Sequence, residues 1–499
     1  MKVEPALRAA ALPLLALLVL SLLLPALSAR AEPAATAPAV PAAAQGDSVS
    51  TSAGGSGFLR RQGGRLRAPS GGPLARFRGL LGYAVVLGLC WLLSVNRRGI
   101  QWRPVLWGLA LQALFALIVL NPLVGQLFFD AVDQGIRGLI GFAQAGIEFL
   151  FQSTDAHEIR HVDPRSGALI AETFLGRMSP ALKSLAFGVL PTIIFFSALL
   201  SLLYHLGVMQ WVVKGIARGM MHMLGTSGAE TLSCTANIFL GQTEAPLLVR
   251  PFIAGLTQSE LMAVMVGGFA TVAGGVMAVY VGMLQALPGI AGHLMTASCM
   301  AAPAALAVSK LIYPETERPV TAGGAQVPVD RPDANMIEAV ARGATDGMTL
   351  VLNIAAMLIA FVAMMALCNG VLGLFGTSLQ QLLGWVLAPL AWTMGVPWAE
   401  APAVGRLLGE KLVLTELLAY LDLKSMLDAP VPVLSARSAV IACYALCGFA
   451  NVASIGVQLG GIGAMAPSRR ADLARLGLRA MLAGALVSCL SAALAGILV

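Results

Sequence analysis

Charged residues are scarce in this chain: Asp, Glu, Lys and Arg make up only 11% of its 499 residues. A soluble domain carries about 25% charged residues, so most of this surface must face something other than water. The chain also lacks the Gly-rich phosphate loop that ends in Lys-Ser or Lys-Thr, and it lacks a nucleophile elbow. These absences remove the usual signs of ATP-driven transport and of a serine hydrolase.

Long apolar runs take the place of charge: 58% of the residues are hydrophobic. Runs of roughly 20 apolar residues are long enough for a helix to cross a bilayer. They do not alternate with polar residues, which favours helices over a β-barrel. The sequence therefore predicts an all-α polytopic membrane protein with about eight transmembrane helices. The expected spans are Leu80–Val95, Val105–Leu120, Leu190–Leu206, Leu261–Leu284, Leu294–Ile312, Thr349–Leu367, Ala439–Leu459 and Leu473–Val499.

Positive charges lie near the ends of these runs. The formal net charge is +7, and membrane topology explains it better than nucleic acid does, so no nucleic-acid polymer is expected as a partner. Arg97, Arg98 and Arg103 predict a cytoplasmic loop, whereas the mixed charges of 152–178 suit an external loop. The expected location is a bacterial inner membrane, crossed several times.

The N-terminus resembles a targeting segment. Lys2 and Arg8 precede the apolar core Leu12–Leu27, and Ala29-Arg30-Ala31 offers a cleavage site with small residues. An uncleaved anchor helix is the alternative. The following residues, 32–78, are rich in Ala, Pro, Gly and Ser and predict a flexible linker.

Two regions are too broken for one helix and too apolar for a surface loop. Gly and Pro interrupt both Met223–Leu256 and Leu383–Leu423. They predict two re-entrant hairpins, because non-helical backbone at membrane depth is tolerated where it lines a cavity. Each hairpin precedes a span with a weak point of its own, at 270–275 and at 448–454. Hairpin plus discontinuous helix thus occurs twice, as an inverted repeat, which is a sequence pointer to a transporter binding site.

This organisation divides the chain into segments. We expect a signal peptide or anchor at 1–31, the linker at 32–78, scaffold spans at 79–222, and the first hairpin, broken helix and following span at 223–312. A polar cytoplasmic link at 313–346, a scaffold span at 347–382, the second hairpin at 383–425, and the second broken helix and last span at 426–499 complete the chain.

Polar side chains in the first repeat are candidates for function, because amide and ionisable groups are costly in a bilayer. Gln242 offers a donor and an acceptor and Glu244 a strong acceptor, so the pair can read the edge of an imide-like base. Asn237 has a carbonyl oxygen suited to a small hard cation, and the Thr271 hydroxyl could join it. The structural alternative is that these groups only hold the hairpin together.

A second group of polar residues follows in the second repeat. The Glu416 carboxylate could accept two hydrogen bonds from a sugar diol, and an ion pair with Lys411 is the structural alternative. Asn451 and Ser454 share one helix face, and Phe449 could pack against a planar ring. Hydrogen bonds to neighbouring helices are the alternative for Asn451 and Ser454.

At these residues the sequence resembles the concentrative nucleoside transporter family, from roughly Leu80 to Val499. The resemblance is strongest at Gly241-Gln242-Thr243-Glu244-Ala245-Pro246, at Gly409-Glu410-Lys411 running to Thr415-Glu416, at Cys447-Gly448-Phe449-Ala450-Asn451 through Ser454, and at Gly460-Gly461-Ile462-Gly463. The family usually has Asn-Glu-Phe where this chain has Thr415-Glu416-Leu417, so Glu416 survives while its neighbours differ.

The resemblance implies import of nucleosides, coupled to sodium or protons, by a homotrimer embedded in the lipid bilayer with one site in each protomer. It implies that Gln242, Thr243 and Glu244 face the base, that Glu416, Asn451 and Ser454 bind the ribose, and that Val276 and Phe449 form apolar walls. It further implies that the cation is bound by the side chains of Asn237 and Thr271 and by the carbonyls of Leu240, Val272 and Gly275.

Sodium is the preferred coupling ion, because Asn237 and Thr271 have no obvious role in proton coupling. A proton needs only one group of suitable pKa, and burial of Glu244 or Glu416 could provide one. Two other classes compete with a transporter. A membrane-embedded hydrolase using a buried glutamate would need a nucleophile or metal beside it, which the clusters lack. A passive channel fits poorly with two hairpins that block a path from opposite sides.

Overall fold

The computed structural model describes residues 61–62, 65–66, 72–121, 125–155, 157–162, 169–174, 178, 182, 184–323, 333–429 and 433–499. The expected leader at 1–31 and most of the expected linker at 32–78 lie outside the described residues. Within them the chain is nearly all helical, which confirms the predicted class. The strands of the described chain form two small antiparallel hairpins, β1 (Arg61–Gln62) with β2 (Arg65–Leu66) and β3 (His157–Val162) with β4 (Leu169–Phe174).

Seven helical segments among the described residues are long and apolar enough to cross a membrane. Five of these segments are formed by single continuous helices, namely α2 (Pro73–Leu92), α3 (Trp102–Val119), α11 (Ile290–Ile312), α12 (Met336–Gly373) and α18 (Arg470–Leu498). The segment Leu185–His205 contains α5 (Thr192–His205), and Gln258–Met283 is formed by α9 and α10. Two shorter apolar helices, α16 (Ala436–Leu446) and α17 (Val452–Met465), occupy the remaining predicted span.

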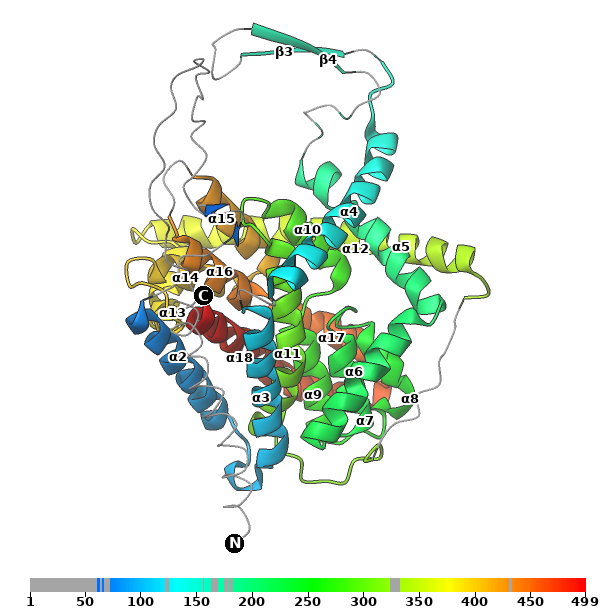
Figure 1. Ribbon diagram of the computed structural model, residues 1–499, viewed down its shortest axis with the longest axis vertical. Helices are drawn as coiled ribbons and strands as arrows, with labels where there is room; N and C mark the ends of the chain where they lie inside the picture. The colour runs from blue at the N-terminus through cyan, green and yellow to red at the C-terminus, as the bar shows by residue number, and fades with distance from the viewer. Residues whose placement is uncertain are drawn as a thin grey trace, which may run out of the picture.

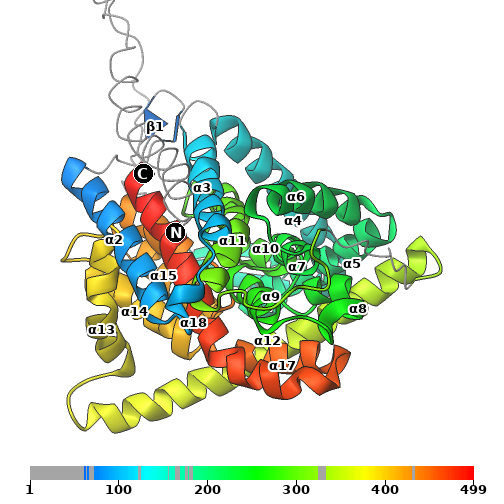
Figure 2. The same ribbon diagram turned by 90° about the horizontal axis from the view of Figure 1, so that it is seen from below.

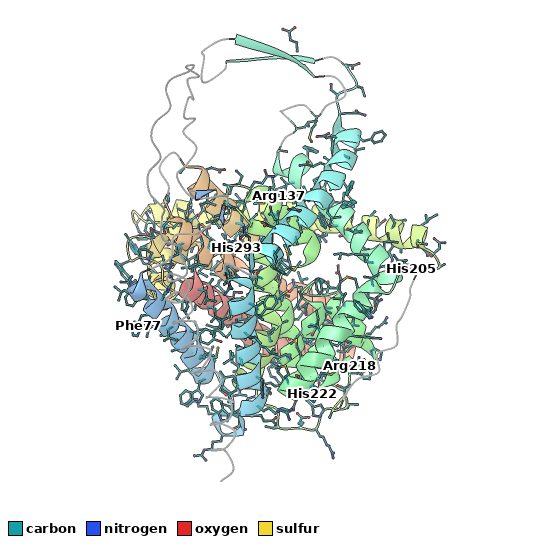
Figure 3. The ribbon with its side chains drawn as sticks, in the orientation of Figure 1. Phe77, Arg137, His205, Arg218, His222 and His293 are labelled. Carbon is teal, nitrogen blue, oxygen red and sulfur yellow. The ribbon has the colours of Figure 1, made fainter. Side chains whose placement is uncertain are left out.

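Two amphipathic helices are not predicted from hydropathy, because polar residues interrupt their apolar runs. The first, α4 (Gly125–Phe151), leads to the β3–β4 hairpin at the top of Figure 1. The second, α6 (Val208–Leu224), lies at the opposite end, where Figure 3 labels Arg218 and His222. Arg103 holds the end of α6 by donating hydrogen bonds to the carbonyls of His222 and Met223. The β3–β4 hairpin falls in the loop 152–178 that was expected to be external.

The first repeat starts with a short helix and a non-helical turn. It consists of α7 (Gly228–Ala236), a 3-10 helix at Ala245–Val249, α8 (Arg250–Ile253), α9 (Gln258–Ala270) and α10 (Gly274–Met283). Ser227 and Glu230 form a capping box at the start of α7, and Thr257 and Glu260 form another at the start of α9. These caps satisfy backbone N–H groups that water cannot reach.

The second repeat has the same order of elements. It consists of α14 (Ala401–Val413), α15 (Glu416–Asp428), α16 and α17, preceded by α13 (Leu379–Thr393). Thr415 caps α15, and Ser435 caps α16. In this repeat the tip between the two hairpin helices is only Leu414 and Thr415, whereas the first repeat has a longer turn at 237–244.

The two broken helices touch at their breaks. Gly448 lies in the break between α16 and α17 with φ of +119°, a conformation that favours glycine. A Cβ at Gly448 would lie only 2.7 Å from the carbonyl oxygen of Phe269 and 2.9 Å from that of Ala270, at the end of α9. The sequence pattern predicts both breaks, and the packing of one on the other brings the two repeats together.

The long helix α12 begins at Met336, so it includes the last residues of the polar link expected at 313–346. It runs along one edge of the molecule in Figure 2 and packs on α5. Gly343 and Gly347 make this close approach: a Cβ at Gly343 would lie 2.6 Å from the Ser201 Cβ, and one at Gly347 would lie 2.8 Å from the Ile194 Cα. Small residues in this spacing allow two helices to approach closely in a membrane.

Candidate functional site

The turn of the first hairpin places Asn237 in the interior. Asn237 ends α7 and is fully buried, and its Nδ2 donates to the Ser233 carbonyl at 3.0 Å. Its Oδ1 has no hydrogen-bond partner among the described residues. A buried amide oxygen without a partner is costly, and it is also free to bind a cation.

Thr271 lies in the break between α9 and α10, close to Asn237. Its Oγ1 donates to the Gly267 carbonyl at 2.9 Å. Gly267 itself lies against Asn237, because a Cβ there would be 3.3 Å from the Asn237 Nδ2. The Gly274 N–H donates to the Phe239 carbonyl at 2.9 Å, which ties the break to the hairpin turn.

The three residues expected to offer backbone carbonyls lie in the hairpin turn and at the break between α9 and α10. Leu240 lies in the turn of the hairpin, Val272 in the break, and Gly275 in the first turn of α10, and all three are buried. A sodium ion prefers oxygen ligands. Among the described residues no group of three or more His, Cys, Asp or Glu side chains could hold a metal ion, so neutral oxygens are the donors that this region offers.

The second expected group centres on Glu416, at the start of α15. Its Oε1 accepts a hydrogen bond from the Tyr280 hydroxyl at 2.9 Å, and its Oε2 accepts one from the Asn451 Nδ2 at 2.7 Å. The Asn451 Oδ1 in turn accepts from the Ser454 N–H at 2.8 Å and thereby caps α17. Glu416, Asn451 and Ser454 are therefore brought together, as expected, across the two parts of the second repeat.

Lys411 does not form the ion pair with Glu416 that was the structural alternative. Its Nζ donates to the carbonyls of Ala445 at 3.0 Å and Cys447 at 3.3 Å and to the Ser488 hydroxyl at 3.0 Å. Lys411 thus holds the end of α16, where carbonyls lack helical partners. The Glu416 carboxylate is left to polar groups that are neutral.

Gln242, Thr243 and Glu244 lie in different surroundings. Gln242 is buried and accepts a hydrogen bond at 3.1 Å from the Nε2 of Gln458 on α17. Thr243 packs against Gly461, where a Cβ would lie 2.5 Å from its Cγ2. Glu244 is exposed, and its Oε2 accepts from the Gly241 N–H at 3.1 Å. Gln242 and Glu244 do not meet in this conformation.

The two apolar residues of the expected site flank the polar ones. Val276 is buried on α10, one helical turn before Tyr280, so the two side chains share a face. Phe449 is half-buried in the break between α16 and α17, two residues before Asn451. Both therefore come from the segments that carry the Glu416 group.

Tyr280 and Gln458 are two further functional candidates, which the sequence motifs do not single out. Asn451, Ser454 and Gln458 follow one another at spacings of three and four residues, so α17 presents one polar stripe. This stripe runs from the Glu416 cluster to Gln242. The amide of Gln458 is a polar group in the apolar run of α17, and this feature could have identified it from the sequence. Tyrosine is not unusual in a membrane helix, so Tyr280 can be recognised only from its contact with Glu416 in the folded chain.

A buried ionic network holds the helix ends of the first repeat together. The Lys310 Nζ lies 2.7 Å from the Glu230 Oε2 and 3.2 Å from the Glu315 Oε2, and it donates to the Ser259 hydroxyl at 2.9 Å. Glu260 accepts from the Ser227 hydroxyl at 2.5 Å. These bonds connect the starts of α7 and α9 to the end of α11, and so they fix the hairpin that carries Asn237.

Comparison with known proteins gives matches along most of the chain. Residues 81–154 match a family described as "Na+ dependent nucleoside transporter N-terminus", and residues 293–496 match its C-terminus. Residues 186–287 match a family described as "Nucleoside recognition". The transporter YutK of Bacillus subtilis is 43% identical over 431 residues, which cover 84% of this chain and 99% of YutK.

A human relative and two solved structures extend the comparison. The human sodium/nucleoside cotransporter 1 is 40% identical over 445 residues, covering 85% of this chain and 64% of that protein. The inward-facing, substrate-bound structure of CNTnw is 40% identical with a TM-score of 0.74, covering 85% of this chain and 98% of CNTnw. A variant of CNTnw in an outward-facing state gives a TM-score of 0.75 at 40% identity with the same coverage.

Proposed function

This chain belongs to the family of sodium-dependent, concentrative nucleoside transporters, and from that premise we propose where its substrates bind and how they move. The protein is a multi-pass membrane transporter and not an enzyme: it takes up nucleosides with sodium by alternating access. This agrees with the function expected from the sequence. It rules out the two alternatives, a membrane-embedded hydrolase and a passive channel.

The ribose binds at Glu416. The observation that carries this proposal is the pair of hydrogen bonds that Glu416 accepts from Tyr280 and Asn451. A carboxylate offers about four acceptor positions, so two remain for the hydroxyls of a ribose. The tip of the second hairpin and the break after α16 meet at this carboxylate, so a bound sugar contacts both. Asn451 and Ser454 complete the ribose side of the site.

The base binds along the polar stripe of α17, toward Gln242. Gln458 donates to Gln242 and to the Met265 carbonyl, and this fixes the orientation of the Gln242 amide. Thr243 lies beside it, while Glu244 has to leave the Gly241 N–H before it can face the base. Val276 and Phe449 supply the apolar walls of the site, against which the planar ring packs.

Sodium binds between the hairpin turn and the break after α9. The free, buried Oδ1 of Asn237 supports this assignment, as does the short path from Asn237 through Gly267 to Thr271. Backbone carbonyls of Leu240, Val272 and Gly275 supply the further oxygens, since discontinuous helices free such groups. The ion then joins the two elements, so its binding orders the first hairpin.

The pair α5 and α12 forms the static scaffold against which the hairpins and broken helices move. The glycine packing of α12 on α5 supports this division. So does the link in which Arg342 donates to both carboxylate oxygens of Asp333, at 2.6 and 2.8 Å, and to the Ser201 hydroxyl at 3.0 Å. The Arg342 guanidinium holds the pKa of Asp333 below its usual range.

A homotrimer in a bacterial inner membrane is the assembly that we assign to the protein. Large apolar side chains on α12 are exposed in the single chain, including Leu352, Ile359 and Leu367. Their spacing of seven and eight residues places them on one face of the helix, which suits contact with other copies around the scaffold and with lipid.

Uridine binding provides the experiment for the nucleoside site. Purified protein should bind uridine in the presence of sodium and bind an analogue without the two ribose hydroxyls at least tenfold more weakly, because bonds to a charged group are worth about 1.5–3 kcal/mol. Equal affinity for the two ligands would show that Glu416 does not bind the ribose. It would not contradict the transport activity itself.

A further inference from the structure

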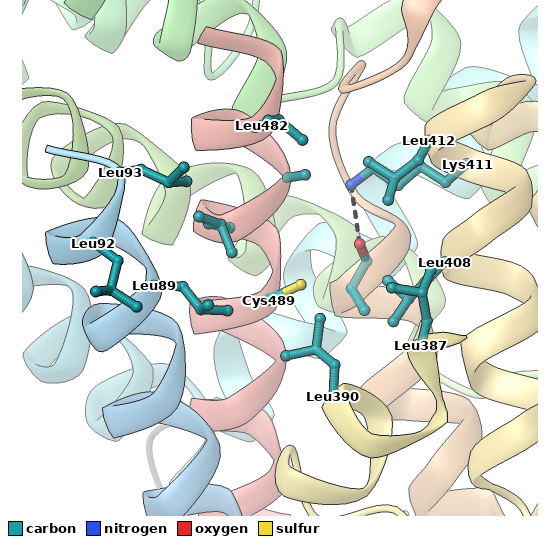
Figure 4. A pocket seen from close by; sticks show the side chains of 13 residues that line it. Leu89, Leu92, Leu93, Leu387, Leu390, Leu408, Lys411, Leu412, Leu482 and Cys489 are labelled. Carbon is teal, nitrogen blue, oxygen red and sulfur yellow. Dashed lines mark hydrogen bonds between the residues drawn. The ribbon is translucent and has the colours of Figure 1, made fainter. Parts of the chain in front are cut away.

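An apolar pocket of about 270 Å³ lies away from the nucleoside site, between α2, α13, α14 and α18. Figure 4 shows leucines from all four helices around it, together with Cys489 and the stem of Lys411. The wall of the pocket is apolar throughout. An apolar cavity of roughly 150 Å³ stays dry and accepts benzene, so this larger pocket suits hydrocarbon and not water.

The pocket reaches the outer surface of the chain. Leu92 and Leu93, at the end of the membrane-spanning helix α2, belong to its wall and are 56% and 38% exposed. Hydrocarbon chains of lipids are therefore the ligand at hand. Because lipid tails are as apolar as leucine, the gain comes from filling a space whose walls otherwise lack packing partners.

Positive charge lies at one end of the pocket. Arg97 follows α2 and donates to the Leu92 carbonyl at 3.1 Å. Arg479 is exposed on α18 and precedes the pocket residue Leu482 by three positions, which places the two on one face. Residues 73–103 contain no acid, and Asp472, the acid of α18, pairs with Arg469.

We propose that this pocket binds one acyl chain of an anionic phospholipid, whose phosphate lies at Arg97 and Arg479. Arg97 belongs to the loop expected on the cytoplasmic side, where anionic lipids attract basic residues. Arg479 lies in the first part of α18, a few residues after Arg469, Arg470 and Arg475. The occupied pocket supports the second hairpin, because the stem of Lys411 forms part of its wall while the Lys411 ammonium holds the end of α16. This site is separate from the proposed nucleoside and sodium sites.

Photolabelling of the full chain in liposomes tests the proposal. The probe is phosphatidylglycerol with a diazirine in its acyl chain, and labelled peptides are mapped by mass spectrometry. We expect labels on α2, α13 and α18 at the pocket. Ala485→Phe, which fills the pocket, should reduce them severalfold, whereas the exposed control Leu478→Phe on the same helix should leave them unchanged. Pocket labelling that is equal in both variants would overturn the proposal.

The headgroup is tested with exposed residues, so that folding is not at risk. Phosphatidylglycerol should label the pocket more strongly than phosphatidylcholine, by about fivefold for each arginine, and Arg97→Gln with Arg479→Gln should abolish that preference. A preference that survives both substitutions would contradict the assigned phosphate position.

The identity of the occupant is tested without choosing a ligand. A photoreactive residue at Leu390, in the pocket wall, should form an adduct with a phospholipid. An adduct with residues 1–71 of the chain or with a second copy, in place of lipid, would overturn the proposal.

Discussion

Asn451 donates a hydrogen bond of 2.7 Å to Glu416, and this single contact joins the start of α15 to the break between α16 and α17. Binding of a ligand to Glu416 therefore also depends on the position of the broken helix formed by α16 and α17. The contact brings the tip of a hairpin and the break of a helix, two segments 35 residues apart, together at one carboxylate.

Glu416→Gln should weaken binding of uridine by about 1.5–3 kcal/mol, because a hydrogen bond to a charged acceptor is lost. The same substitution should change binding of an analogue without ribose hydroxyls much less. Tyr280→Phe, which removes one neighbour of the carboxylate and keeps the charge, should have a smaller effect. Isotherms of both ligands measure this, and an equal loss for both would show that Glu416 acts only as a structural residue.

Asn237→Ala should raise the sodium concentration needed for half-maximal uptake by about tenfold or more, the range seen when groups around a metal ion are removed. Nucleoside binding at saturating sodium should remain. Thr235→Val is the matched control, since Thr235 is also buried on α7 but its hydroxyl bonds to the Thr231 carbonyl of its own helix. If both variants show the same sodium dependence as the native protein, the sodium site lies elsewhere.

Lys310→Ala should destabilise the protein by about 3–5 kcal/mol, because it leaves buried carboxylates without their cation. Lys424→Ala should cost no more than about 1 kcal/mol, since the pair of Lys424 with Asp428 is exposed. Thermal unfolding in detergent compares the two. Equal melting temperatures would mean that the buried network contributes no more than a surface ion pair.

The moving unit can be tested by cross-linking after the seven native cysteines have been replaced. Cysteines at Leu200 on α5 and Gly274 on α10 join the scaffold to the unit, because a Cβ at Gly274 would lie 3.6 Å from the Leu200 Cδ1. Cysteines at Ile455 on α17 and Gly477 on α18 are the control pair, where the corresponding distance is 2.8 Å. We expect α18 to move with the unit, because it packs on α9, α16 and α17. A short cross-linker should stop uptake in the first pair only. Uptake that persists with α5 and α10 cross-linked would refute movement of this unit.

The sequence was sufficient for the helical class, because continuous apolar runs leave few alternatives in a bilayer. It also located the breaks, since Gly and Pro mark where helices end. It did not reveal α4 and α6, whose polar residues hide their length from a hydropathy pattern. The polar link is predicted to end at residue 346, but α12 already begins at Met336. The first turns of α12 are polar and have no apolar periodicity to mark them.

Part of the candidate site can also be predicted from the sequence, and part cannot. Glu416, Asn451 and Ser454 could be found from the sequence because each is polar in an apolar segment. Tyr280 could not, since its role depends on the packing of α10 beside α15, which no local pattern specifies. The alternative partner for Glu416 was Lys411, five positions away, and the structure instead directs Lys411 to the end of α16.

The most direct test of sodium-coupled nucleoside transport is uptake of labelled uridine into liposomes that contain the purified protein, with a sodium gradient or a pH gradient imposed alone. We predict accumulation above the external concentration with the sodium gradient and none with the pH gradient. Accumulation that follows the pH gradient and ignores sodium, or mere equilibration under both, would contradict the account.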